Sequence, residues 1–186
     1  MVFAGSAIAQ KITFESISPS DAKWFLLSGA TDPPSDIAIS SRRNRDGCRG
    51  AFLKGIGHDF VNMENKCGKQ LWNKYMNLYL KKKDAKRMIR DFFDDCQKDD
   101  YKPILYYSGH GEIGTGNWCF HDGKLSIREI HEMLPIGCLY PTIISDACYS
   151  GHWANYCLEV NRENFYDFQC LSACPEYSSA EDLPGK

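Results

Sequence analysis

The sequence predicts an α/β fold in which a mostly parallel sheet lies between layers of helices. Two observations lead to this prediction: short apolar runs with the length of buried strands recur along the chain, and amphipathic helical stretches separate them. Strands that alternate with helices form parallel sheets through right-handed crossovers. The chain has 186 residues, which is the size of one domain with a core of its own.

The first predicted elements lie in the N-terminal third of the chain. Lys11–Ile17 is predicted as a short peripheral strand, and Trp24–Gly29, with the sequence WFLLSG, as the first core strand. Residues 30–50 are rich in Pro, Ser, Asp and Arg, so we expect a loop there. Residues 51–65 carry apolar side chains at helical spacing and are predicted as a helix.

The middle of the chain continues the alternation. Tyr75–Leu80 is predicted as the second strand and Asp84–Cys96 as an amphipathic helix. Ile104–Tyr107 is predicted as the third strand, and Trp118–Phe120 as the start of a hairpin. Ser126–Leu134 is predicted as a helix, because its first residue is a good N-cap and a glutamate follows where a capping box needs it.

The last predicted strands complete the sheet. Thr142–Ser145 is predicted as the fourth strand and Phe168–Ser172 as the fifth. The chain therefore divides into an N-terminal extension, residues 1–23, and one folded domain, residues 24–186.

Two of the predicted strands lead directly into a reactive side chain. The run ILYYSGHG contains His110, and the run PTIISDACYSG contains Cys148. A thiol is mostly protonated at neutral pH, so it needs an imidazole nearby to act as a nucleophile. Reactive groups of an open parallel sheet gather beyond the carboxyl ends of neighbouring strands. The sequence therefore predicts Cys148 as a nucleophile and His110 as its base, with the amides of Gly111 and Cys148 as an oxyanion hole.

Other readings of these residue types are weaker. Single Cys and His residues are usually packing residues, and the chain has nine cysteines and five histidines. The repeated strand-to-glycine context favours chemistry for this pair. Neither Cys119 with His121 nor Cys170 with Cys174 has a second pair at zinc-finger spacing, so no metal site is predicted. The basic run Lys81–Arg90 is interleaved with acids and is predicted as a solvated helix face.

The two glycine-rich segments resemble the catalytic blocks of a known family. Ser108-Gly109-His110-Gly111 and the segment 146–151, DACYSG, are similar to the two blocks of caspase-like cysteine peptidases. The resemblance is closest to metacaspases and their bacterial relatives, which carry an acid two residues before the cysteine. Leu171–Cys174 together with residues 178–182 is a weaker match to the segment that follows the nucleophile in metacaspases. The resemblance covers roughly residues 24 to 182.

The resemblance implies a caspase-like three-layer sandwich and a cysteine-type endopeptidase with a Cys-His dyad. Asp146 stands two residues before Cys148, where the alternation of an extended chain puts both side chains on the same side. A carboxylate there favours a cationic P1 side chain. By resemblance to metacaspases, Asp146 and Ser108 line the S1 pocket and bind a P1 Arg or Lys. The alternative for Asp146 is that it only orders the turn.

Three departures from the family pattern matter for function. Metacaspases add a second pocket acid in a segment whose nearest match here is Gly47–Ala51, with alanine at the acid's place, so one pocket carboxylate is expected to be missing. No acidic cluster matches the calcium site of some metacaspases, so calcium dependence stays open and no other cofactor is expected.

If the enzyme processes itself, the segment between Gly151 and Phe168 is the expected place, where Arg162 is the only Arg or Lys.

The third departure concerns the C-terminus. Caspase-like domains continue beyond the fifth strand, whereas this chain stops at Lys186, so we expect a sheet that is shortened at its C-terminal edge. An open edge can pair with the other subunit of a homodimer or with another protein that completes the sheet. A truncated fragment would have the same short C-terminus. The alternative function is therefore a catalytically inactive caspase-like regulatory or scaffold module.

Composition narrows the remaining function classes. The net charge of −2 gives no reason to expect nucleic acid or a membrane surface as a partner, so protein or peptide substrates are expected. An odd number of irregularly spaced cysteines favours a reducing compartment over a disulfide framework. No apolar run approaches the roughly 18 residues that span a bilayer, and the N-terminus lacks the positive segment of a secretory signal. We therefore expect a cytoplasmic protein.

Overall fold

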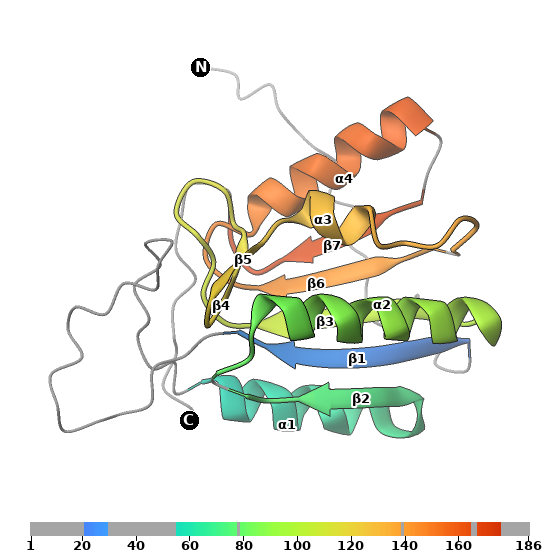
Figure 1. The fold of residues 1–186 in the computed structure, drawn as a ribbon, viewed down its shortest axis with the longest axis horizontal. Coiled ribbons are helices and arrows are strands. Elements are labelled where there is room, and N and C mark those ends of the chain that lie inside the picture. The colour runs from blue at the N-terminus through green and yellow to red at the C-terminus, as the bar shows by residue number, and fades with distance from the viewer. Residues whose placement is uncertain (1–20, 30–54, 78, 139, 165–166, 176–186) are drawn as a thin grey trace, which may run out of the picture.

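A five-stranded sheet forms the centre of the molecule, with strand order β2-β1-β3-β6-β7 (Figure 1). The computed structural model describes residues 21–29, 55–77, 79–138, 140–164 and 167–175. The strands of the sheet are β1 Ala22–Ser28, β2 Leu71–Tyr75, β3 Lys102–Ser108, β6 Thr142–Asp146 and β7 Gln169–Ser172. All neighbouring pairs are parallel. The predicted α/β fold with a mostly parallel central sheet is therefore confirmed.

Helices cover both faces of this sheet. They are α1 Ile56–Cys67, α2 Lys82–Lys98, α3 Ile127–His131 and α4 Gly151–Asn164. Successive side chains of a strand point to opposite faces, so Trp24 and Leu26 of β1 pack with α1, whereas Phe25 and Leu27 pack in the cluster that contains α2, α3 and α4. The molecule therefore has three layers, and its two sides are called the α1 face and the α4 face below.

The handedness of the connections explains why α1 lies apart from the other helices. The chain crosses from β1 to β2 in one direction along the sheet, and later moves from β2 to β3, β6 and β7 in the other. Since crossovers between parallel strands are right-handed, reversing the direction places the connecting helix on the opposite face. Because all five described strands are parallel, their carboxyl ends lie at one edge of the sheet.

Several predicted elements are confirmed in detail. The predicted helix Asp84–Cys96 is the central part of α2, and Ile89, Phe92 and Phe93 on its inner side are fully buried. The predicted hairpin consists of β4 Trp118–Phe120 and β5 Gly123–Leu125, which pair in antiparallel fashion. The predicted capping box is also present: the Ser126 hydroxyl accepts the amide of Glu129, and the Glu129 carboxylate accepts the amide of Ser126.

The predicted position of the second strand, Tyr75–Leu80, is wrong. The strand is Leu71–Tyr75, and the chain leaves the sheet directly after it. The Asn77 amide donates to the Ser28 hydroxyl at 3.1 Å, and the Asn77 carbonyl accepts the amide of Leu80 at 3.1 Å, so this segment forms a turn. β2 carries Asn and Lys at exposed positions and is the first strand of the sheet order. Its sequence therefore lacks the continuous apolar run of a central strand.

Other parts of the prediction need shorter comment. Helix α4 was not predicted, and it occupies the segment expected to hold a self-processing site. The helix predicted at residues 51–65 begins at Ile56, within the described part of the chain. The predicted strand at residues 11–17 and the loop at residues 30–50 lie outside the described residues. Of the helices that the structure describes, none combines the length and apolar character needed to cross a bilayer.

Candidate active site

The two predicted catalytic residues follow neighbouring strands of the sheet. His110 comes two residues after the end of β3, and Cys148 comes two residues after the end of β6. The last residues of these strands, Ser108 and Asp146, are register partners. The amide of Gly109 donates to the carbonyl of Asp146 at 3.3 Å, which continues the contact beyond the sheet. The fold therefore brings both loops together at the carboxyl edge.

The loop of His110 and the loop of Cys148 touch through their backbones. A Cβ atom added to Gly111 would overlap the carbonyl oxygen of Cys148 and would lie 3.2 Å from its amide nitrogen. Backbone atoms cannot move aside as a flexible side chain can. The glycine after His110 is therefore what allows the two loops to approach this closely.

The main chain of His110 is held by hydrogen bonds from two sides. Its carbonyl accepts the hydroxyl of Tyr107 at 2.9 Å and the amide of Cys119 at 3.0 Å. The Tyr107 ring is fully buried and stacks on Trp118 of β4 with ring centroids 4.3 Å apart. Because this partner is rigid, the position of the His110 backbone is fixed by the core of the α4 face.

The turn that carries Cys148 has an unusual backbone. Tyr149, directly after Cys148, has φ +58° without being a glycine, and such conformations are often found at functional sites. The Cys174 thiol donates to the carbonyl of Ala147 at 3.2 Å, which holds the turn from β7's side. Helix α4 starts at Gly151. A helix N-terminus favours negative charge nearby, which suits a thiolate nucleophile.

Gly111, which the sequence predicts as part of an oxyanion hole, forms an antiparallel bridge with Trp118. The hydrogen bonds of that bridge run from Cys119 to His110 and from Glu112 to Asn117, so they flank Gly111 without using its amide. In such a pair the amide points away from the partner strand. The bridge to Trp118 therefore leaves the Gly111 amide unused.

An acidic pocket of about 310 Å³ lies beside the end of β6 on the α1 face. Its lining residues come from α1, β3, β6 and the β7 region, namely Asp59, Asn62, Met63, Lys66, Tyr106, Ile144, Ser145, Asp146, Leu171, Ser172 and Ala173. The Tyr106 hydroxyl donates to a carboxylate oxygen of Asp146 at 3.1 Å. Asp146, two residues before Cys148, therefore lines this pocket, whereas neither Cys148 nor His110 is among the lining residues.

Ser108 has a different position from the one predicted. Its side chain is 3% exposed and is not part of the pocket lining. Its hydroxyl donates to a carboxylate oxygen of Asp59 at 3.1 Å. Ser108 therefore positions a pocket acid instead of forming the pocket wall itself.

Asp59 is a pocket residue that the sequence did not predict. A second carboxylate does line the pocket with Asp146, namely Asp59 in the first turn of α1. Residues 47–51, where the second acid was sought, lie outside the described residues. The available signal was helical spacing: Asp59, Asn62 and Met63 share one face of α1 and meet the pocket together.

The two carboxylates influence each other. Burial and, after it, the negative charge of Asp59 raise the pKa of Asp146, against the opposing hydrogen bond from Tyr106. Lys66 also lines the pocket, but it lies two helical turns beyond Asp59, about 10 Å along α1. The end of the pocket near β6 is therefore acidic, and a cation bound there would be stabilised by both carboxylates.

Two further predictions concern self-processing and metals. Arg162 belongs to α4, so a cut at this residue requires the end of that helix to unwind first. Within the described ranges, no group of three or more His, Cys, Asp or Glu side chains is arranged as metal ligands would be.

Comparisons with known proteins bear on the fold. No protein-family model matches the chain, and no curated protein matches it. Among solved structures, the chain is similar to the crystal structure of Chaetomium thermophilum Raptor, with a TM-score of 0.55 and 12% sequence identity. The similarity covers 84% of this chain and 15% of that chain, so the present chain spans a small part of Raptor's length. At this identity the likeness concerns the fold alone.

Proposed function

We propose that this chain is a cysteine endopeptidase of the caspase-like type that cleaves peptide bonds after Arg or Lys. The observation that supports this most strongly is the backbone contact between the His110 loop and Cys148 at the ends of neighbouring strands, with an acidic pocket beside it. A nucleophile, its base, an amide directed to the same side and a charged pocket together form the parts that peptide hydrolysis requires.

The proposed reaction proceeds through a thioester. His110 takes the proton of the Cys148 thiol, and the sulfur attacks the carbonyl carbon of the substrate. The amides of Gly111 and Cys148 stabilise the negative oxygen of the tetrahedral intermediate. His110 then gives its proton to the leaving amine as the C–N bond breaks. Water, deprotonated by His110, hydrolyses the thioester and restores the thiol.

The pocket supports selectivity for a basic P1 residue. Asp59 and Asp146 both contribute carboxylates to it, and its volume of about 310 Å³ is at the lower end of the range of ligand pockets. Two carboxylates close together favour a bound cation over a neutral or anionic side chain. A P1 aspartate would add a third negative charge and is expected to be rejected.

The alternative function is an inactive regulatory module. The expected lack of a second pocket carboxylate would favour it, and the presence of Asp59 beside Asp146 in the pocket instead supports the peptidase. We further propose that the enzyme works in the cytoplasm on protein or peptide substrates, since a catalytic thiol needs reducing conditions.

Strand β7 is the last in the described sheet order, and pairing of this edge with a second copy or another protein stays a prediction.

Hydrolysis of fluorogenic peptides tests the proposed function. Peptides that differ only in a P1 Arg, Lys or Asp are assayed under reducing conditions, with and without calcium. We expect cleavage after Arg and Lys that is lost in Cys148→Ala and in His110→Ala. Asp146→Asn and Asp59→Asn should each weaken cleavage after Arg, whereas Asp94→Asn, on the exposed side of α2, serves as the matched control for removing an acid.

The outcomes separate the candidate functions. Cleavage after Asp in preference to Arg would overturn the assignment of the acidic pocket. No cleavage of any peptide by a folded protein, with or without calcium, would favour the inactive module. Calcium stimulation would show a metal dependence that the residues themselves do not predict.

A further inference from the structure

An exposed apolar side chain lies on the loop that follows His110. Ile113 is 78% exposed, whereas most large apolar residues of the described chain are buried. A single exposed apolar residue is not unusual in itself. The reason to consider this one is its place, because the loop Gly111–Asn117 begins at the catalytic histidine and extends beyond the strand ends (Figure 1).

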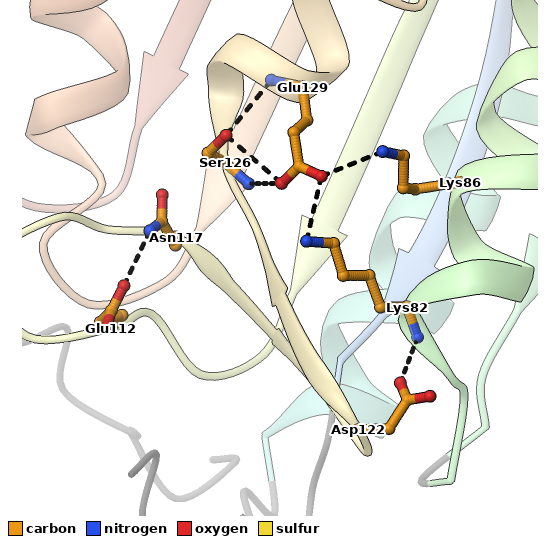
Figure 2. Close-up of polar contacts among 7 residues, drawn as sticks. All are labelled: Lys82, Lys86, Glu112, Asn117, Asp122, Ser126 and Glu129. Atoms are coloured by element: carbon orange, nitrogen blue, oxygen red, sulfur yellow. Dashed lines mark hydrogen bonds and ion pairs between the residues drawn. The ribbon is translucent and has the colours of Figure 1, made fainter. Parts of the chain in front are cut away.

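The loop is held rigidly by its own polar residues. The Glu112 carboxylate accepts hydrogen bonds from the Thr115 hydroxyl at 2.6 Å, the side-chain amide of Asn117 at 2.7 Å and the Lys124 ammonium at 2.5 Å. Figure 2 shows the contact between Glu112 and Asn117. The Glu112 carbonyl also accepts the amide of Gly116 at 2.9 Å. Because these bonds close the loop, Ile113 is presented at a fixed position.

Both ends of the loop rest on the turn of the nucleophile. A Cβ atom added to Gly111 would overlap the carbonyl oxygen of Cys148. A Cβ atom added to Gly116 would overlap the carbonyl oxygen of Tyr149 and would lie 3.2 Å from the Trp153 ring. Trp153 belongs to the core cluster of the α4 face. The loop therefore stands beside Cys148 on the α4 face.

The acidic pocket lies on the other side of the same edge. Its walls include Met63 of α1 and Ile144 of β6, both members of the core cluster on the α1 face. A substrate whose P1 side chain enters this pocket has its scissile bond at Cys148. The base must also reach the leaving amine to protonate it. The part of the substrate after the scissile bond therefore passes on the side of His110, toward the α4 face.

We propose that the loop Gly111–Asn117 forms the subsite for the residue after the scissile bond, and that Ile113 selects an apolar side chain at this P1′ position. This inference rests on the proposed peptidase function and names the specificity of its leaving-group side. The hydrogen bonds to Glu112 keep the loop ordered before a substrate binds. An apolar P1′ side chain can therefore be buried against Ile113 without the entropic cost of ordering the loop, and this makes the preference selective.

Internally quenched peptides with a constant P1 Arg and a varied P1′ residue test the proposal. Wild type is expected to cleave peptides with P1′ Leu or Val about three to ten times more efficiently, in kcat/KM, than peptides with P1′ Asp. Ile113→Ser should reduce this ratio to below about two, and Ile113→Lys should reverse it. Since the side chain is largely exposed, neither substitution should affect folding.

Ile136 provides the matched control. It is 97% exposed and lies between α3 and β6, at the amino end of the sheet. Ile136→Ser should therefore keep the wild-type ratio. A flat P1′ profile in wild type, or the same profile in wild type and Ile113→Ser, would overturn this inference and leave the peptidase standing. A wild-type protein that cleaves none of the peptides would overturn both.

Discussion

At the scale of single residues, the site depends on a glycine as much as on its reactive side chains. Gly111 lies against the backbone of Cys148, and any side chain there would collide with atoms that cannot rotate away. The bridge to Trp118 also leaves the Gly111 amide unused by the neighbouring strand. In the proposed reaction, this one position therefore sets the spacing of the two loops and supplies an oxyanion donor.

Gly111→Ala is expected to reduce activity strongly. The added methyl group must push the His110 loop away from Cys148, and the loss of one oxyanion donor alone lowers kcat by roughly 10²-fold or more. The measurement is kcat and KM for a P1 Arg peptide, together with the thermal unfolding temperature. Gly57→Ala is the control, because a Cβ atom there meets nothing within 4 Å. Equal activity of the two variants would contradict this account of the site.

The two pocket carboxylates lead us to expect that peptide affinity depends on pH. Asp146 has a raised pKa, so it binds a proton at a higher pH than an ordinary aspartate and loses its charge earlier as the pH falls. In the Cys148→Ala protein, affinity for a P1 Arg peptide should therefore fall with a midpoint above the usual aspartate value of about 3.8. Asp59→Asn removes the neighbouring charge and should move this midpoint to lower pH.

A peptide with citrulline at P1 is the control for this titration. Citrulline has nearly the shape of arginine but no charge, so its affinity should change little over the same pH range. The account of the pocket fails if the two peptides respond to pH alike, or if Asp59→Asn leaves the midpoint of the arginine peptide where it was.

The residues of the site differed in how far the sequence could reveal them. His110 and Cys148 stand in compact segments in which strand, glycine and reactive residue follow one another, so the local pattern was sufficient to place them just after two strands. Asp59 reaches the pocket from α1, far earlier in the chain, and only the packing of that helix on the sheet shows it. The role of Ser108 as a partner of Asp59 could not be predicted for the same reason.

At the scale of elements, a cluster of charges joins two helices and the hairpin on the α4 face. Glu129 of α3 accepts hydrogen bonds from Lys82 and Lys86 of α2, both at 3.0 Å. The amide of Lys82 donates to Asp122 between β4 and β5 at 2.7 Å. Figure 2 shows these contacts together with the capping box of Ser126. This arrangement supports the hairpin, which in turn holds the carbonyl of His110.

Glu129→Gln is expected to destabilise the protein in a pH-dependent way. Burial alone would raise the pKa of Glu129, but hydrogen bonds from Lys86, Lys82 and the Ser126 amide outweigh it and lower the pKa to about 2. A lowered pKa contributes stability that is fully present above the ordinary value near 4.5 and is lost as the pH falls toward 2. We expect a loss of about 1–2 kcal/mol near pH 7.

Denaturant unfolding at a series of pH values measures this effect. The difference in free energy of unfolding between wild type and Glu129→Gln should shrink as the pH falls below about 4.5. Asp84→Asn removes one partner of the exposed pair with Arg87 and should cost much less. A difference that stays constant down to pH 3 would contradict the assigned role of the charge cluster.

Elements with a strong local pattern were predicted well, and those without one were not. The helix α2 and the strands β1, β3 and β6 carry apolar residues in clear runs or stripes. Strand β2 is short, partly exposed and polar at its centre, so its position was wrong. Helix α4 was missed although Trp153, Cys157 and Val160 are buried at helical spacing, because polar residues interrupt this sparse stripe.

At the scale of the whole molecule, the sheet separates the acidic pocket from the loop that follows His110. Reversal of the direction along the sheet after β2 places α1 on one face and the remaining helices on the other. The acidic pocket lies on the α1 face, and the loop after His110 lies on the α4 face, with Cys148 between them. The alternation of strands and helices predicts this layering, but strand order and the pocket depend on packing that no local pattern encodes.

Covalent trapping of the nucleophile tests the central claim most directly. An irreversible peptidyl ketone with Arg at P1 is incubated with the protein, and the adduct is located by mass spectrometry. We predict one adduct, on Cys148, that is absent in Cys148→Ala, much slower to form in Asp146→Asn, and much weaker with Asp at P1. An adduct on another cysteine, equal labelling by the Arg and Asp reagents, or no labelling of folded protein would contradict the claim.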